Sequence, residues 1–226
     1  MLSIIQVTLC LMCFLCVLLR RYFIIEGALI KPKKGKVNLN TQKFVVGLGG
    51  MPGSGKSLVV ETAHELGYSI VTMGDVIREE TRKRGLELNP SNVGKVMLEL
   101  RAKDGNYVVA KKCVPKIEAQ SSKCVLVDGL RSLHEADIFK AHFDSFTLIA
   151  VHAPPQIRFG RLVRRGRSDD PTSWQVFHER DMRELGVGLG YVIALAEKIL
   201  VNDETIEAFK VKVKDNLLSV EAEWLK

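Results

Sequence analysis

A glycine-rich stretch at residues 50–57, with the sequence GMPGSGKS, separates an apolar run at 44–48 from a helix-like stretch at 58–66. It matches the full P-loop pattern, a turn that ends in Gly-Lys-Ser between a strand and a helix. The glycines let the turn curl until its N–H groups converge on a phosphate, and the helix N-terminus adds partial positive charge. Lys56 then reaches the β- and γ-phosphates, and Ser57 ligates Mg²⁺. The stretch predicts binding of a nucleoside triphosphate with Mg²⁺ through Gly50, Met51, Pro52, Gly53, Ser54, Gly55, Lys56 and Ser57.

Asp128 stands at the end of a second apolar run, Cys124-Val-Leu-Val-Asp128. A carboxylate at this place, beside a P-loop, can hold Mg²⁺ directly or through the water ligands of the ion. The alternative is a cap for the helix that is expected from Ser132. Because the chain already contains a P-loop, we interpret Asp128 as the partner of Ser57 in binding the metal.

Two arginines follow the ends of expected strands. Arg78 closes the segment Thr72-Met-Gly-Asp-Val-Ile-Arg78, and Arg131 lies three residues beyond Asp128. Ligands of parallel α/β sheets bind outside the carboxyl ends of the strands, so both guanidinium groups are expected to face one crevice and dock an anionic acceptor. Asp75 can cap the helix that carries Arg78, or act as a base if the acceptor is a hydroxyl group. The alternative for this segment is a capping Asp and a solvated Arg.

Arginines crowd residues 158–167 and close in the segment Arg164-Arg-Gly-Arg-Ser-Asp-Asp-Pro171. Phosphoryl transfer spreads negative charge over the moving group, and mobile arginines can stabilise this charge while they exclude water. The Arg-Gly-Arg turn is typical of a short lid, at residues 164–171. A solvated basic helix face is the alternative, and it suffices for Arg158 and Arg161. The predicted catalytic residues are Lys56, Asp128, Arg164, Arg167 and Arg180.

The rest of the body alternates short apolar runs with helical stretches, which is typical of an α/β domain with a parallel sheet. A long insertion at residues 75–121 separates the second and third runs, and an insertion of this size usually covers a ligand. Within it, Asn89-Pro90-Ser91 supplies a helix stop and the next N-cap. The expected strands are Phe44–Leu48, Ser69–Thr72, Cys124–Asp128, Phe146–His152 and Ile199–Asn202, and the expected helices are Leu58–Leu66, Val76–Arg84, Asn92–Lys103, Tyr107–Ala119, Ser132–His142, Gln156–Arg165, Ser173–Leu185, Gly188–Glu197 and Thr205–Trp224.

The formal net charge of +7 is concentrated near the start of the chain. Residues 1–42 carry six Lys and Arg against Glu26 alone, which leaves only +2 for the remaining 184 residues. A nearly neutral body argues against nucleic-acid binding. The five cysteines show no disulfide framework, and the run Cys10-x2-Cys13-x2-Cys16 has Arg20 where a fourth iron–sulfur ligand would stand. The sequence therefore indicates no metal site other than the one at the P-loop.

Residues 2–19 form an uncharged run that, as a helix, reaches about 27 Å against a bilayer core of about 30 Å. Basic residues follow it, so a single membrane anchor would leave the body in the cytoplasm. The alternatives are an interfacial or buried helix and a mis-assigned start, the latter because a compact domain can begin near Thr41. All these interpretations separate residues 1–42, with a solvated linker at 31–40, from a P-loop domain at 43–226.

Five segments in this order, GMPGSGKS, TMGDVIREE, VDGLRS, RRGRSDDP and ILVNDETIE, resemble the nucleoside monophosphate kinase group. The resemblance is strongest to an archaeal family of adenylate-kinase-related, dephospho-CoA-kinase-like P-loop proteins. It implies a three-layer sandwich with a five-stranded parallel sheet in the order 2-3-1-4-5, a helical acceptor-binding insertion and a short lid. In adenylate kinases, the arginine matched by Arg78 binds the acceptor phosphate, and those matched by Arg167 and Arg180 embrace the transferred phosphoryl group.

The resemblance leaves the acceptor open. Asp128-Gly-Leu-Arg131 departs from the adenylate kinase sequence Asp-Gly-x-Pro-Arg, so a nucleoside monophosphate and dephospho-CoA are both candidates. The guanine-binding sequence Asn-Lys-x-Asp is absent, which favours ATP as the donor. The sequence thus predicts a Mg²⁺-dependent ATP phosphotransferase that acts on a small anionic acceptor. A nucleotide-binding regulatory ATPase without an acceptor is the alternative, because P-loops serve both classes.

Overall fold

The computed structural model describes residues 23–25, 28–30, 42–167 and 169–225, in two units at 1–40 and 41–226. In the first unit, strands β1 (Phe23–Ile25) and β2 (Ala28–Ile30) pair antiparallel. The predicted apolar helix at 2–19 and the predicted linker at 31–40 lie outside the described residues. In the part of the chain that is described, no helix is both long and apolar enough to cross a membrane.

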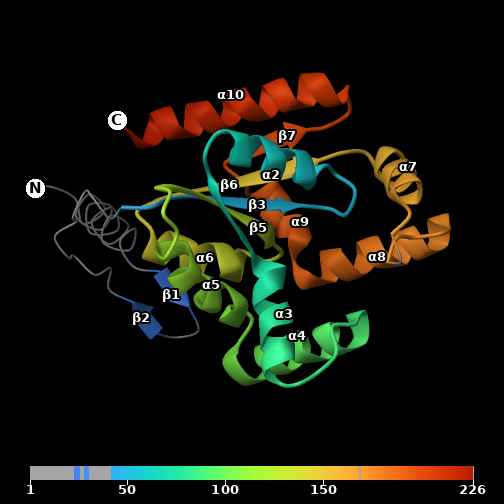
Figure 1. The fold of residues 1–226 in the computed structure, drawn as a ribbon, viewed down its shortest axis with the longest axis horizontal. Coiled ribbons are helices and arrows are strands. Elements are labelled where there is room, and N and C mark those ends of the chain that lie inside the picture. Colours follow the sequence, from blue (N-terminus) through green and yellow to red (C-terminus); the bar gives the residue numbers. More distant parts are fainter. Residues whose placement is uncertain (1–22, 26–27, 31–41, 168, 226) are drawn as a thin grey trace, which may run out of the picture. The chain divides into compact units, whose positions relative to one another are not determined.

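The second unit is built on a five-stranded sheet in which every strand is parallel to its neighbours. The strand order is β4-β5-β3-β6-β7, which is 2-3-1-4-5 when the count starts at β3, so the predicted order is confirmed (Figure 1). The strands are mainly apolar because helices cover both faces of a parallel sheet. The strands are β3 (Phe44–Gly50), β4 (Ser69–Thr72), β5 (Cys124–Leu130), β6 (Ser145–His152) and β7 (Lys198–Val201).

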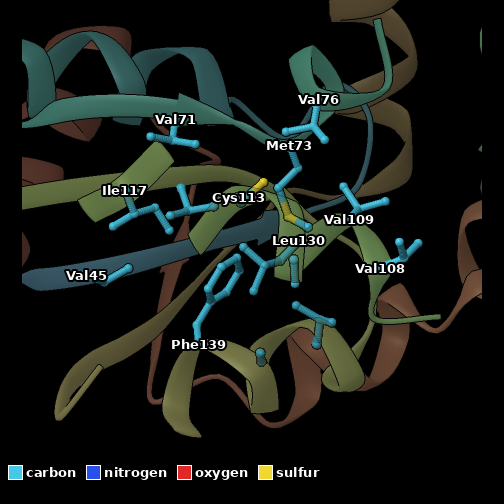
Figure 2. Packing of buried hydrophobic residues seen from close by; sticks show 14 of the residues in the cluster. Val45, Val71, Met73, Val76, Val108, Val109, Cys113, Ile117, Leu130 and Phe139 are labelled. Atoms are coloured by element: carbon cyan, nitrogen blue, oxygen red, sulfur yellow. The ribbon is translucent and has the colours of Figure 1, made fainter. Parts of the chain in front are cut away.

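Successive residues of the central strand feed two separate cores. Val46 and Leu48 pack with α2 (Lys56–Glu65) and α10 (Ile206–Trp224) on one face of the sheet. Val45 belongs to the core of the opposite face, where α5 (Val108–Glu118), α6 (Leu133–His142) and α9 (Leu189–Ala194) lie (Figure 1). Figure 2 shows this second core, with Ile117, Phe139 and Leu130 close to the strand that carries Val45. The alternation of strand side chains thus produces the predicted three-layer sandwich.

The predicted insertion between β4 and β5 consists of three helices. Asn89 caps the second of them as predicted, because its side-chain oxygen accepts a hydrogen bond from the Asn92 N–H at 2.9 Å. The first begins at Met73, three residues earlier than predicted, so Asp75 lies inside its first turn and does not cap it. The helices are α3 (Met73–Lys83), α4 (Pro90–Asp104) and α5 (Val108–Glu118).

The remaining helices follow the predicted order with small differences at their ends. They are α6 (Leu133–His142), α7 (Pro155–Arg165), α8 (Trp174–Val187) and α9 (Leu189–Ala194). Helix α9 ends three residues before the predicted Glu197, whose carboxylate accepts a hydrogen bond from the Leu148 N–H at 2.8 Å. This side-chain contact holds Glu197 against β6, directly before β7 begins at Lys198, so Glu197 is not part of the helix.

Chemical labelling of Cys113 tests the packing of α5. Burial raises the pKa of the Cys113 thiol to about 12. Only on the order of 10⁻⁴ of this group is then thiolate at pH 8, and the thiolate is the reactive form. We expect iodoacetamide at pH 8 to modify Cys113 at least about 100-fold more slowly in the folded protein than in urea, as measured by peptide mass spectrometry. Labelling of the folded protein at the rate of an ordinary thiol would show that α5 does not pack in this way.

Candidate active site

The P-loop joins the end of β3 to the start of α2 and has the backbone that its glycines permit. Gly55 has φ +107°, and a Cβ atom on it would lie 2.0 Å from the side-chain nitrogen of Asn202. Gly53 has φ +78°, and a Cβ atom there would lie 2.8 Å from the Arg158 carbonyl oxygen. A side chain at either position would therefore strain the backbone and collide with a neighbouring element.

Lys56 is the first residue of α2, and its ammonium group lies over the loop that precedes it. The group donates hydrogen bonds to the carbonyl oxygens of Gly50 at 2.6 Å and Met51 at 3.2 Å. Burial lowers the pKa of Lys56 to about 8, although the nearby charge of Asp128 opposes this shift. A cation that is partly stripped of water in this way gains most from an anionic ligand.

Asp128 lies where the pairing of β5 with β3 is interrupted. Leu48 pairs with Asp128 and Gly49 pairs with Leu130, so the chain bulges at Gly129, which has φ +101°. The Asp128 Oδ1 atom is buried and has no hydrogen-bond partner among residues 42–167 and 169–225. Burial also raises the pKa of this carboxyl group, against the effects of Lys56 and Arg131. A buried oxygen without a partner is costly, and a hard cation such as Mg²⁺ would satisfy it.

Arg158 is buried and its side chain binds a main-chain oxygen of the P-loop, so it is not part of the solvated helix face that the sequence suggested. Its guanidinium donates to the Pro52 carbonyl oxygen at 3.2 Å and to the Ala153 carbonyl oxygen at 3.1 Å. It also forms a two-point ion pair with the buried carboxylate of Asp181 on α8, where one of the two N···O distances is 2.9 Å. One side chain thus joins α7 and α8 to the loop.

Asn202, the first residue after β7, completes this support. Its side-chain nitrogen donates to the Ser54 carbonyl oxygen at 2.8 Å, and its side-chain oxygen accepts from Arg161 at 3.1 Å. Asn202 is buried, so Arg161 is held at the cleft by a polar partner and not only by solvent. Among our predicted site residues there is none from this strand end. The sequence did contain a signal for Asn202, which is a polar residue directly after an apolar strand, at the same edge of the sheet as the P-loop.

The predicted lid is the turn between α7 and α8. Helix α7 ends at Gly166, which has φ +62°. Arg165 pairs with Asp170 through two hydrogen bonds, and Arg180 donates to the Asp169 carbonyl oxygen at 2.9 Å. The side chains of Arg164 and Arg167, by contrast, form no hydrogen bond or ion pair with any described residue. Arg165 of the lid and Arg180 of α8 are therefore held by acidic residues, whereas Arg164 and Arg167 have guanidinium groups available for a ligand.

The arginines predicted to dock an acceptor both line the cleft and both have acidic partners. Arg78 donates from Nε to the Asp75 carboxylate at 2.9 Å, one helical turn away. Arg131 lies 3.6 Å from the carboxylate of Glu184 on α8. Asp75 itself does not line the cleft. The structure thus brings Arg78 and Arg131 to the predicted crevice and gives Asp75 the role of an ion-pair partner.

One cleft of about 1290 Å³ lies at the carboxyl ends of the strands, and the P-loop, Asp128 and most of the predicted arginines line it. Met51 and Ser54, which the sequence also predicted as nucleotide-binding residues, are buried and do not line the cleft. Our predictions missed a buried ion pair in the wall, between Arg101 of α4 and Glu135 of α6, because 34 residues separate the partners. The predicted residues that line the cleft are Gly50, Pro52, Gly53, Gly55, Lys56, Ser57, Arg78, Asp128, Arg131, Arg164, Arg167 and Arg180.

Replacement of Gly55 tests the loop geometry. We expect Gly55→Ala to lower the free energy of unfolding by about 1–3 kcal/mol, since alanine is strained at this φ and collides with Asn202. The matched control is Gly186→Ala within α8, where a Cβ atom meets nothing within 4 Å. That change should stabilise the protein by about 0.5–1 kcal/mol. Urea unfolding measures both, and equal effects would contradict the loop structure.

The Arg158–Asp181 pair gives a second test. Asp181→Asn leaves a buried guanidinium without its counter-charge, and we expect a loss of about 3–5 kcal/mol in the free energy of unfolding. Asp169→Asn breaks an exposed ion pair with Arg180 and should cost less than about 1 kcal/mol. Denaturant midpoints compare the two variants. A loss for Asp181→Asn as small as that of the control would show that α7 and α8 are not joined by this pair.

Comparison with known proteins assigns the chain to a family. The AAA domain family matches residues 49–178, which include the P-loop, Asp128 and the lid. A UPF0200 protein of Methanocaldococcus jannaschii is 47% identical over 166 residues, which cover 73% of this chain and 84% of that protein. A UPF0200 protein of Thermococcus gammatolerans is 47% identical over 175 residues, which cover 76% of this chain and 92% of that protein.

A solved structure shares the fold. The shikimate kinase from Bacteroides thetaiotaomicron matches with a TM-score of 0.53 at 16% identity, over 77% of this chain and 98% of that one. At this identity the likeness concerns the fold alone. On the strength of the domain match and of the identity to relatives over most of both chains, the protein belongs to the UPF0200 family of archaeal P-loop proteins with an AAA domain.

Proposed function

We propose that this protein is a Mg²⁺-dependent kinase that transfers the γ-phosphoryl group of ATP to a small anionic acceptor. The observation that carries the proposal is the sharing of one cleft by three groups of side chains. Lys56 and the P-loop offer a polyphosphate site, Asp128 offers a carboxylate oxygen without a partner, and arginines approach from the insertion and from the lid. The resemblance to nucleoside monophosphate kinases and the fold shared with a shikimate kinase support this class of reaction.

In this proposal the P-loop amides and Lys56 bind the β- and γ-phosphates of ATP. Ser57 and Asp128 would hold Mg²⁺ directly or through water, and the ion would neutralise negative charge on the phosphates. Arg78 and Arg131 dock the acceptor, while Arg164, Arg167 and Arg180 close over the moving group and exclude water. The bond from the γ-phosphorus to the bridging oxygen breaks, its electron pair leaves with ADP, and the acceptor oxygen forms the new bond.

The position of Asp75 favours a phosphate group over a hydroxyl group as the acceptor. A hydroxyl acceptor such as dephospho-CoA requires a base, and the sequence suggested Asp75 for that role. In the structure Asp75 pairs with Arg78 and does not line the cleft. A phosphate oxygen is already ionised at neutral pH and requires no base. Nucleoside monophosphates are therefore the preferred acceptors of the two classes.

A labelled-phosphate assay tests the proposal. The full chain is incubated with Mg²⁺, γ-labelled ATP and a panel of nucleoside monophosphates and dephospho-CoA, and products are separated by chromatography. We expect label on an acceptor, with a loss of about 10²-fold or more in Lys56→Met and in Asp128→Asn. Lys210→Met removes a surface ion pair with Glu61, outside the cleft, and serves as the control that retains activity.

Other results of the assay distinguish the alternatives. Release of labelled phosphate to water, with no label on any acceptor, would support a regulatory ATPase. Calorimetry gives an independent measurement, because binding of ATP with Mg²⁺ is required by both functions. A folded sample that takes up no ATP, or a Lys56→Met variant that binds it as well as the natural chain, would contradict the polyphosphate site itself.

A further inference from the structure

The wall of the cleft formed by the insertion is apolar and ends in a buried ion pair. Ile77 of α3, Met97 of α4 and Val109 of α5 line this part of the cleft, which we call the acceptor wall. Val93 and Leu130 line the cleft beside them. The same helices contribute Arg101, and α6 contributes Glu135. An apolar wall with a few polar groups is typical of a site for a small organic molecule.

The carboxylate of Glu135 has all the partners that it needs within the protein. Its Oε2 atom accepts hydrogen bonds from the main-chain N–H groups of Arg131 at 2.8 Å and Ser132 at 3.3 Å. Its Oε1 atom accepts one from Arg101 at 3.2 Å. Glu135 is buried, and its charge is balanced by Arg101. It therefore supports the turn that carries Arg131 and has little capacity left to accept from a ligand.

The Arg101 side chain, by contrast, lacks partners for most of its donors among the described residues. It makes one hydrogen bond within residues 42–167 and 169–225, from Nη2 to Glu135, and a guanidinium has five N–H donors. Its Nε atom is buried without a partner, and the side chain is only 14% exposed. A buried donor without a partner destabilises the protein, and a ligand oxygen that accepted from it would remove this penalty.

Arg84 is a comparison arginine whose donors have acidic partners. It follows α3 and contacts α4, where its Nη1 atom donates to Glu99 at 2.7 Å, and its Nε atom lies 3.5 Å from a carboxylate oxygen of Glu80. It does not line the cleft. Both edges of the Arg84 guanidinium therefore have acidic partners, whereas Arg101 has one acidic partner and free donors at the acceptor wall.

We propose that Arg101 selects the acceptor, and that the acceptor is a phosphomonoester whose ring carries a carbonyl oxygen at the end far from the phosphate. This inference rests on the proposed kinase function. The ring lies against the apolar side chains of the acceptor wall, and its carbonyl oxygen accepts a hydrogen bond from Arg101. A guanidinium can only donate, and the Glu135 oxygens are already engaged, so a ring with an amino group in that place gains no partner.

Equilibrium binding of two matched pairs of nucleotides tests the inference. Inosine and adenosine monophosphates differ by a carbonyl against an amino group, and so do uridine and cytidine monophosphates. Each is titrated into the full chain with Mg²⁺ and a non-hydrolysable ATP analogue. We expect the carbonyl member of each pair that binds to do so at least about 10-fold more tightly, since the other leaves a buried donor unpaired.

Variants assign the preference to Arg101. The double variant Arg101→Met with Glu135→Gln removes both charges together, which avoids an unpaired buried carboxylate. We expect its preference between paired nucleotides to fall below about 3-fold, with uptake of the ATP analogue as evidence that the variant is folded. Arg84→Met removes a different ion pair of α4, with Glu99, outside the cleft and should keep the preference of the natural chain.

The outcomes separate this inference from the function on which it rests. If the natural chain binds the ATP analogue but shows no carbonyl preference, prefers the amino members, or binds none of the four nucleotides, the inference is wrong, while the polyphosphate site stands and the labelled-phosphate assay still decides the kinase function. A preference that survives in the double variant also overturns the role of Arg101. If the natural chain takes up no ATP analogue, the proposed function fails, and this inference fails with it.

Discussion

The shape of the P-loop depends on donors that hold its carbonyl oxygens. Lys56 donates to Gly50 and Met51, Arg158 donates to Pro52, and Asn202 donates to Ser54. In a trans peptide group the N–H points away from the carbonyl, so the bonds to Gly50, Pro52 and Ser54 also fix the direction of the N–H that follows each of them. The donors come from α2, from α7 and from the end of β7, and the sheet and its helices are what hold them together.

Charge in the cleft is arranged in pairs. Arg78, Arg131 and Arg101 each have a carboxylate partner, and so do the lid arginines Arg165 and Arg180. These acids hold long, flexible side chains in place before any ligand arrives, which reduces the entropy that binding must overcome. An anionic ligand that approaches Arg78 or Arg131 competes with a carboxylate that is only partly buried. Replacement of that carboxylate by the ligand as the partner of the arginine therefore costs little free energy.

Local patterns in the sequence predicted most of the fold. The P-loop, the five strands and the three helices of the insertion follow from short apolar runs and turn residues, and the structure confirms them. The order of the strands was implied by the resemblance to the nucleoside monophosphate kinase group, and it is confirmed too. The cap assigned to Asp75 was wrong because α3 starts at Met73, where packing of Met73 and Val76 in the core extends the helix. Element ends are set by such tertiary contacts, which no local pattern contains.

Contacts between distant residues could not be predicted in the same way. Arg158 and Asp181 lie 23 residues apart, and Arg101 and Glu135 lie 34 apart. Each of these residues occurs in a helix with other charged residues, so composition does not distinguish the buried partner from its exposed neighbours. The ion pair between Arg158 and Asp181 has a mechanical consequence. This pair fixes α7 to α8 beside the loop, so the turn at Gly166 can rotate only about the buried contact between the two helices. Any such rotation also moves Arg158 and therefore its hydrogen bond to the Pro52 carbonyl oxygen of the P-loop.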